Sequence, residues 1–198
     1  MGDRDSDRAN YHHGNLRQAL LDLALSRVEA AGLEALSLRD LASSLGVSKT
    51  APYRHFPDRN SLLRAIIELG WADLRTDLLV SRGRETAPEA GLRAMGRAYL
   101  AFAVRRSNLY RLLFSGQGKE LFTEAPCPKE IDAFAPLVEQ IALCQAAGWR
   151  TSGDPQMLAL SVWAQVHGAA ELAIEGLVPV PEGMEPHEFW AGILETIL

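Results

Sequence analysis

The stretch from Ser37 to Leu63 constrains the fold of this chain more than any other part of the sequence. Ser37, followed three residues later by Asp40, has the spacing of a helix N-cap with an acidic residue in the first turn. Apolar residues then recur at three- and four-residue spacing as far as Gly46, and glycine readily adopts the left-handed conformation that ends a helix. The sequence therefore predicts a short helix that begins after Ser37 and stops at Gly46.

A second short helix is expected directly after this one, from about Lys49 to His55. Ser48 offers another N-cap oxygen, and Pro52 lies in the first turn, where a missing N–H costs little. Two short helices joined by a glycine-containing turn can form a helix-turn-helix unit, whose second helix enters the major groove of DNA. The spacing alone leaves open a helix pair without a DNA-binding role. The candidate DNA-binding residues are Ser37, Arg39, Ser48, Lys49, Thr50, Ala51, Tyr53, Arg54, His55 and Arg59.

The segment GVSKTAPYRHFPDRNSLL resembles the helix-turn-helix signature of the TetR family of transcriptional repressors, and the resemblance extends from about Tyr11 to Trp71. It implies that Tyr53 and His55 contact phosphates, while Thr50 and its neighbours face bases. It also implies that Phe56 packs inward. The family therefore favours the DNA-binding interpretation of the helix pair.

One pair of positions departs from the family's usual pattern. Arg59 and Asn60 stand where the family often has Lys followed by Glu. Arginine keeps the positive charge, but its planar fork of donors can make a different phosphate contact from that of a lysine.

The net charge of −5 at pH 7 is unusual for a DNA-binding protein, but it is unevenly distributed along the chain. Residues 1–60 carry eight Lys or Arg and eight Asp or Glu, so all the excess acid lies beyond the candidate DNA-binding unit. Between Gly46 and Asn60 there are three basic residues and one acidic residue. A small local positive patch is therefore possible on an acidic protein, and its size favours binding as a homodimer.

The composition is that of a globular chain, with 198 residues of which 47% are apolar. No apolar run approaches the roughly 18 residues of a membrane span, and the polar first residues do not resemble a signal peptide, so we expect a cytoplasmic protein without membrane contact. Cys127 and Cys144 lack metal-site spacing and are expected to be free thiols. Residues 1–13 are expected to form a mobile arm, and no cofactor or metal site is expected.

Helical periodicity continues through the rest of the chain, so the sequence predicts an all-α fold of about nine helices. Pro136 is expected either to kink one of these helices or to delay its start, and the glycine- and proline-rich stretch before residue 129 is expected to be a loop. We divide the chain into a DNA-binding domain, 1–57, and an effector-binding and dimerisation domain, 58–198. The later helices are expected at about 58–81, 88–106, 109–114, 129–147, 154–176 and 186–198.

The second domain is rich in aromatic residues at positions where a ligand pocket is expected, although aromatics at helical spacing more often belong to a core. Trp163, His167 and Gly168 also resemble a W-x-x-x-H-G motif of one branch of the TetR family. His167 could line the pocket, join a dimer contact or be a core histidine. The candidate ligand-binding residues are Trp71, Tyr99, Phe102, Tyr110, Phe114, Phe134, Trp163 and His167.

The resemblance implies a homodimeric repressor of double-stranded operator DNA that a small apolar or aromatic effector releases. We expect the dimer to form through the last two helices, with Phe189 and Trp190 as anchors. A helical adaptor without DNA binding is the alternative, and it would be favoured if Lys49, Tyr53 and His55 were buried. An enzyme fits least, because the sequence has no nucleophile elbow, phosphate loop or metal-spaced cluster.

Overall fold

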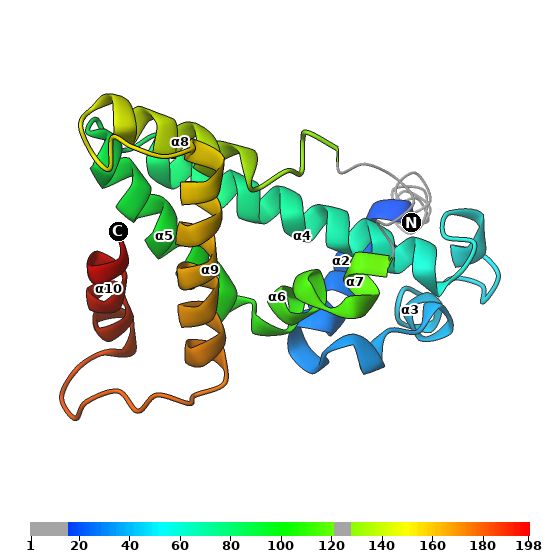
Figure 1. Cartoon of the computed structure of the whole chain (residues 1–198). Helices are drawn as coiled ribbons and strands as arrows, with labels where there is room; N and C mark the ends of the chain where they lie inside the picture. Colours follow the sequence, from blue (N-terminus) through cyan, green and yellow to red (C-terminus); the bar gives the residue numbers. More distant parts are fainter. Residues whose placement is uncertain (1–15, 121–127) are drawn as a thin grey trace, which may run out of the picture.

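The computed structural model describes residues 16–120 and 128–198, and all regular elements within these two ranges are helical (Figure 1). This confirms the all-α fold, while the arm expected over residues 1–13 lies outside the described residues. Two 3-10 helices, η1 (Leu33–Ala35) and η2 (Pro52–Arg54), accompany the α-helices. The α-helices are α2 (Leu16–Ala31), α3 (Leu38–Ser44), α4 (Arg59–Arg82), α5 (Pro88–Arg105), α6 (Ser107–Phe114), α7 (Gly116–Glu120), α8 (Ala135–Ala146), α9 (Pro155–Ile174) and α10 (Pro186–Ile197).

Helix α3 begins and ends where the sequence predicts. The Ser37 hydroxyl accepts a hydrogen bond from the Asp40 backbone N–H, which satisfies one of the free donors of the first turn. At the other end, Gly46 has a φ of 67° and the Val47 N–H reaches back to the Ala42 carbonyl, as in a Schellman motif. Local side chains and one glycine therefore fix the turn that follows α3.

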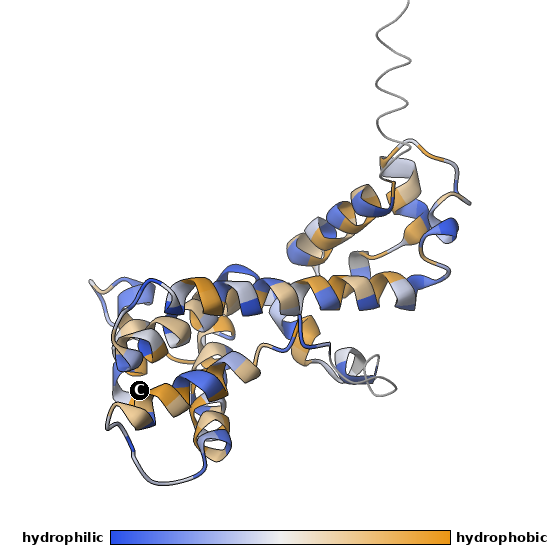
Figure 2. Ribbon diagram, turned by 90° about the horizontal axis from the view of Figure 1, so that it is seen from above, coloured by the Kyte–Doolittle hydropathy of each residue, from blue (hydrophilic) through white to orange (hydrophobic). Residues whose placement is uncertain are grey.

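The long helix α4 connects the two ends of the molecule (Figure 1). Its 24 residues correspond to a rod of roughly 36 Å at 1.5 Å per residue. A capping box starts it, because the Asp58 carboxylate accepts the Ser61 N–H while the Ser61 hydroxyl accepts the Asp58 N–H. In Figure 2, viewed from above, α2 and the helix pair, formed by α3 and η2, lie at one end of α4, and α5, α8, α9 and α10 lie towards the other.

Helix α10 packs back onto α5 of its own chain. Trp190, which was expected to anchor a dimer together with Phe189, is only 7% exposed, and Leu194 on the same helix is buried. Gly96 permits this approach, since a Cβ there would lie 2.6 Å from the Leu198 Cδ1 atom. Trp190 is therefore a core residue of the single chain, and its assignment as a dimer anchor is wrong.

The structure also corrects three expected boundaries. Helix α8 begins at Ala135, several residues later than the expected start at 129, because Pro136 delays the helix rather than kinking it. Residues 116–120 form the short helix α7, where a loop was expected. The helix expected from Lys49 to His55 is a series of turns that tightens into the 3-10 helix η2.

Candidate functional site

The turns before η2 owe their tight geometry to Pro52. A proline has no N–H to donate to the Ser48 carbonyl, and that carbonyl instead accepts the N–H of Ala51. The His55 N–H then bonds to the Pro52 carbonyl three residues back, at 3.0 Å. Bonds of this spacing wind the segment more tightly than an α-helix and keep it short.

The side chains of this segment divide cleanly into buried and exposed sets. Pro52 and Phe56 are buried against the helices behind them, and the Arg17 guanidinium lies over the Phe56 ring at 5.2 Å from its centroid. The inward packing expected of Phe56 is thus observed. The exposed set carries the hydrogen-bond donors that were assigned to DNA, namely Ser48, Lys49, Thr50, Tyr53, Arg54 and His55.

Three further candidates have different surroundings. Arg39 is exposed on α3, and Ser37 is half-buried as the N-cap of the same helix. Arg59 uses its fork within the chain, since its Nε donates to the Leu36 carbonyl at 3.3 Å and its Nη2 to the Leu33 carbonyl at 3.0 Å. These bonds join the start of α4 to η1, so Arg59 positions the helix pair besides any contact that its remaining donors make.

An apolar cavity of about 210 Å³ lies at the other end of the molecule, among α4, α5, α9 and the segment that leads into α8. Its wall consists almost wholly of aliphatic and aromatic side chains, with Asp132 as the one charged residue among those described. An apolar cavity of roughly 150 Å³ binds benzene, so this one can hold a small organic molecule. The wall comprises Trp71, Leu74, Leu78, Leu92, Met95, Gly96, Tyr99, Ile131, Asp132, Ala133, Phe134, Leu137, Val162, Trp163, Val166 and Leu198.

Only half of the aromatic residues proposed for this pocket belong to its wall. Trp71, Tyr99, Phe134 and Trp163 line the cavity. The other four pack behind it, and among them Phe102 and Tyr110 are fully buried. Phe114 and His167 contact each other edge-on, with 4.5 Å between their ring centroids and 61° between their planes. Aromatic content therefore located the pocket region but did not say which rings face the hollow.

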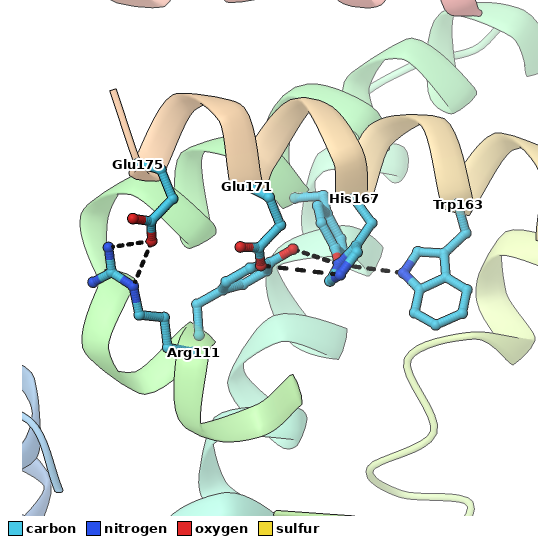
Figure 3. A network of polar contacts seen from close by, with 7 residues as sticks. Arg111, Trp163, His167, Glu171 and Glu175 are labelled. Atoms are coloured by element: carbon cyan, nitrogen blue, oxygen red, sulfur yellow. Dashed lines mark hydrogen bonds and ion pairs between the residues drawn. The ribbon is translucent and has the colours of Figure 1, made fainter. Parts of the chain in front are cut away.

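A polar network joins the cavity wall to the layer behind it (Figure 3). The Trp163 Nε1–H donates to the Tyr99 hydroxyl at 3.2 Å. The Tyr99 and Tyr110 hydroxyls are 3.1 Å apart and lie 2.9 and 2.6 Å, respectively, from the His167 Nδ1. The His167 Nε2 faces the Glu171 carboxylate at 4.0 Å. Five side chains from α5, α6 and α9 thus share one small cluster of polar atoms.

The position of Glu171 assigns the protons in this network. A carboxylate beside Nε2 favours the tautomer with its proton on Nε2, which leaves Nδ1 as an acceptor. Tyr110, the nearer hydroxyl, then donates to Nδ1, and Tyr99 donates to Tyr110. Each hydroxyl proton is used in this arrangement, so the hydrogen bonds run in one direction, from Trp163 through Tyr99 and Tyr110 to His167.

Burial keeps the side chains of this hydrogen-bond network neutral. Desolvation raises the pKa of Tyr99 to about 12 and raises that of Tyr110 as well, because a phenolate would lose the solvation that stabilises its charge. Burial also lowers the pKa of His167, although the nearby Glu171 opposes this effect. Neutral side chains and fixed hydrogen bonds therefore define the inner wall of the pocket at neutral pH.

Helix α6 connects this network to the end of the molecule that holds α2, α3 and η2. Tyr110 lies on α6, and the Asn108 side chain at the start of the same helix donates to the Glu29 carbonyl of α2 at 2.9 Å. Arg106, between α5 and α6, pairs with the Glu29 carboxylate and with Asp73 of α4 at 2.6 Å. A shift of α6 would therefore displace α2 through these contacts.

Two family profiles match the chain, one over each end. Residues 20–66 match "Bacterial regulatory proteins, tetR family", and residues 92–197 match "Tetracyclin repressor-like, C-terminal domain". The second match covers more than half of the chain. The two matches include both the helix pair and most of the cavity wall.

Solved structures with the same fold extend over nearly the whole chain. A protein of unknown function from Rhodococcus sp. RHA1 is 33% identical, with a TM-score of 0.78 over 94% of this chain and 95% of that one. PfmR from Thermus thermophilus, a TetR family transcriptional regulator, is 20% identical, with a TM-score of 0.66 over 90% and 96%. AibR, solved with isovaleryl coenzyme A and operator DNA, is 20% identical, with a TM-score of 0.62 over 91% and 96%.

A curated relative matches over a shorter length. The nucleoid occlusion factor SlmA of Escherichia coli is 33% identical over 100 residues. This match covers half of this chain and half of that relative. The likeness is thus a partial one.

Proposed function

Since the chain belongs to the TetR family and is a transcription regulator with a helix-turn-helix DNA-binding domain, we propose that it is a homodimeric repressor released from its operator by a small apolar ligand. The proposed DNA-binding domain comprises residues 1–57 and the effector domain residues 58–198. The proposed location is the cytoplasm, where the operator is found. The proposed DNA contacts are those of the exposed set, together with Arg39, Ala51 and the free donors of Arg59.

The observation that carries this proposal is that α4 packs in the core at one end of the molecule and borders the cavity at the other. Near its start, Leu62 and Leu63 are fully buried in the core beneath the helix pair, and near its middle Trp71 and Leu74 border the cavity. A ligand that changes the cavity wall therefore acts on the same rigid helix that holds the DNA-binding unit. A ligand with different affinity for two positions of that helix would shift the equilibrium between them.

A second route runs through the polar network. Tyr99 and Trp163 line the cavity, Tyr110 carries the network to α6, and α6 holds α2 through Asn108. The proposal therefore assigns coupling to α4 and α6 together. Such coupling is a free energy shared by the ligand and the operator, so each must weaken the binding of the other.

Helix α9 supports the proposed dimer. Its apolar residues Met157, Leu160 and Leu172 are exposed in the single chain, and the small residues Ala164 and Gly168 lie between them at helical spacing. Contrary to the expectation that no segment is long and apolar enough, α9 could cross a membrane by length and composition alone. It packs, however, against α5, α8 and α10 and forms part of the cavity wall. We therefore assign its exposed apolar stripe to a second copy of the chain.

Gly168 offers a direct test of this interface. No atom of the chain lies within 4 Å of the position that a Cβ would occupy there. Gly168→Trp should therefore fold normally and yet separate the dimer, which light scattering would detect. A dimer of unchanged affinity in this variant would place the interface elsewhere.

We also propose that the chain belongs to the branch with the W-x-x-x-H-G motif, because each of the three residues has a separate task. Trp163 lines the cavity and donates to Tyr99, His167 accepts the proton of Tyr110, and Gly168 leaves open space on the outer side of α9. The histidine would thus act behind the pocket wall. The adaptor alternative is not favoured, because Lys49, Tyr53 and His55 are exposed.

The proposed function can be tested by selecting DNA from a random-sequence library with the purified protein. Enrichment of a palindromic site is expected, with half-sites about 34 to 36 Å apart or a multiple of this, as two-fold symmetric readers require. Lys49→Glu with Arg54→Glu should abolish enrichment, whereas Arg84→Glu, an exposed charge reversal beyond α4, should not. Failure of the wild-type protein to enrich any site would contradict the proposal and favour the adaptor.

A further inference from the structure

The polar groups in the wall of the cavity are acceptors of hydrogen bonds rather than donors. The Trp163 N–H is already used on the Tyr99 oxygen. With the His167 Nδ1 as an acceptor, the Tyr99 proton is directed to the Tyr110 hydroxyl behind the wall. Tyr99 keeps one lone pair, because a phenol oxygen can accept a second bond. A ligand that meets Trp163 and Tyr99 therefore finds no free proton to accept.

Asp132 adds a stronger acceptor to the same wall. Its Oδ1 accepts the backbone N–H groups of Phe134 and Ala135, at 2.9 and 3.2 Å, which fixes the carboxylate just before α8. Its Oδ2 receives no hydrogen bond from the described residues. A half-buried carboxylate with one oxygen left over is thus held rigidly at the edge of an apolar hollow.

No positive group among the described wall residues balances this charge. The wall contains neither Lys, Arg nor His, and Arg75, which follows Leu74 on α4, is not part of it. A carboxylate or phosphate ligand would lose its hydration opposite another negative group and gain no donor in return. An ammonium group would instead pair with Asp132 and lie among the rings of Trp71, Phe134 and Trp163, since aromatic rings attract cations.

We propose that the cavity selects a small apolar molecule that carries a hydrogen-bond donor, most favourably an ammonium group, and rejects carboxylates of the same size. This inference rests on the proposed function, in which the cavity holds the effector. The volume of about 210 Å³ suits a single aromatic ring with a short polar chain, since roughly 150 Å³ suffices for benzene.

Three probes of nearly equal size test the selection, namely phenethylamine, phenethyl alcohol and phenylacetate. Binding is measured on the full chain by titration calorimetry, with ligand-observed NMR for weak binding. The amine should bind at least about tenfold more tightly than phenylacetate, with the alcohol between them. Equal affinities of the amine and phenylacetate would overturn the proposed ligand class and leave ligand-controlled repression intact.

Asp132→Asn separates charge from structure, because an asparagine oxygen can still cap the N–H groups of Phe134 and Ala135. The variant should lose about tenfold in amine affinity and bind the alcohol almost unchanged. The matched control is Asp154→Asn, where Asp154 caps α9 through the Gln156 N–H at 2.7 Å and does not line the cavity. An amine preference that survives Asp132→Asn would overturn the role of Asp132.

Failure of the proposed function would look different. If none of the three probes binds at millimolar concentration, the ligand class is overturned and the cavity is removed as the effector site. DNA selection would still report separately on the DNA-binding role. The two experiments therefore distinguish a wrong ligand class from a wrong function.

Discussion

The two halves of α4 have opposite surroundings. In the first half, Leu62, Leu63, Ile66 and Ile67 are fully buried and belong to a packed core beneath the helix pair. In the second half, the apolar face borders a hollow of about 210 Å³. A close-packed interior transmits a displacement with little loss, whereas a hollow permits side chains to rearrange. The comparison teaches that one helix can be rigid in its packed first half and adaptable where it borders the cavity.

The largest expected difference between the two halves is in the cost of removing a leucine. Leu63→Ala should lower the free energy of unfolding by about 3 to 5 kcal/mol, because it leaves a void in a full core. Leu78→Ala should cost about 2 to 3 kcal/mol, because its side chain already faces empty space on one side. Denaturant unfolding of both variants makes the comparison, and equal costs would contradict the contrast between packed and hollow halves.

A smaller difference is expected between the two tyrosines of the network. Tyr99→Phe leaves the Trp163 N–H without its acceptor, so it should cost about 1 to 3 kcal/mol of stability. Tyr110→Phe should cost less, about 1 kcal/mol, because Tyr99 lies 2.9 Å from the His167 Nδ1 and can donate there directly. Thermal unfolding of the two variants checks the order. A larger loss of stability in Tyr110→Phe would contradict the direction assigned to the hydrogen bonds of the network.

The smallest effect concerns pH. Burial lowers the pKa of His167 in the folded chain, so the unfolded chain binds more protons just below the ordinary value of about 6.5. Stability contributed by neutral His167 is therefore present above that value and is lost as the pH falls towards the lower pKa of the folded chain. His167→Asn, which keeps an acceptor near the Nδ1 position, should flatten the fall in melting temperature below about pH 6.5. An unchanged pH profile would remove His167 from this account.

The parts of the fold that depend on neighbouring residues were predictable from the sequence. Ser37 and Gly46 act through backbone groups within a few residues of themselves, so α3 begins and ends where the sequence predicts. The Asp58 capping box is equally local, and α4 begins next to it, close to the expected start at about residue 58. The start of α8 was misplaced because an apolar pattern begins before Pro136, although Asp132 followed by Pro136 is itself a helix-start signal.

The cavity wall was predictable only in part, because it depends on contacts between distant segments. Tyr99 faces the hollow while Phe102, one turn later on α5, is buried in the core, and both have the same helical spacing. Asp132 was missed because a single acidic residue before a helix carries no sign that a pocket lies beside it. The carbonyl contacts of Arg59 were equally hidden, since their partners lie 23 and 26 residues earlier.

The central claim is that ligand binding in the cavity and operator binding by the helix pair are coupled through α4 and α6. The most direct measurement is the affinity of the tightest-binding probe for the free protein and for its complex with the selected operator. We expect about fivefold or greater weakening in the complex, because coupling between sites is reciprocal. Equal affinities in the two states would contradict ligand-controlled repression and leave a DNA-binding protein with an unconnected cavity.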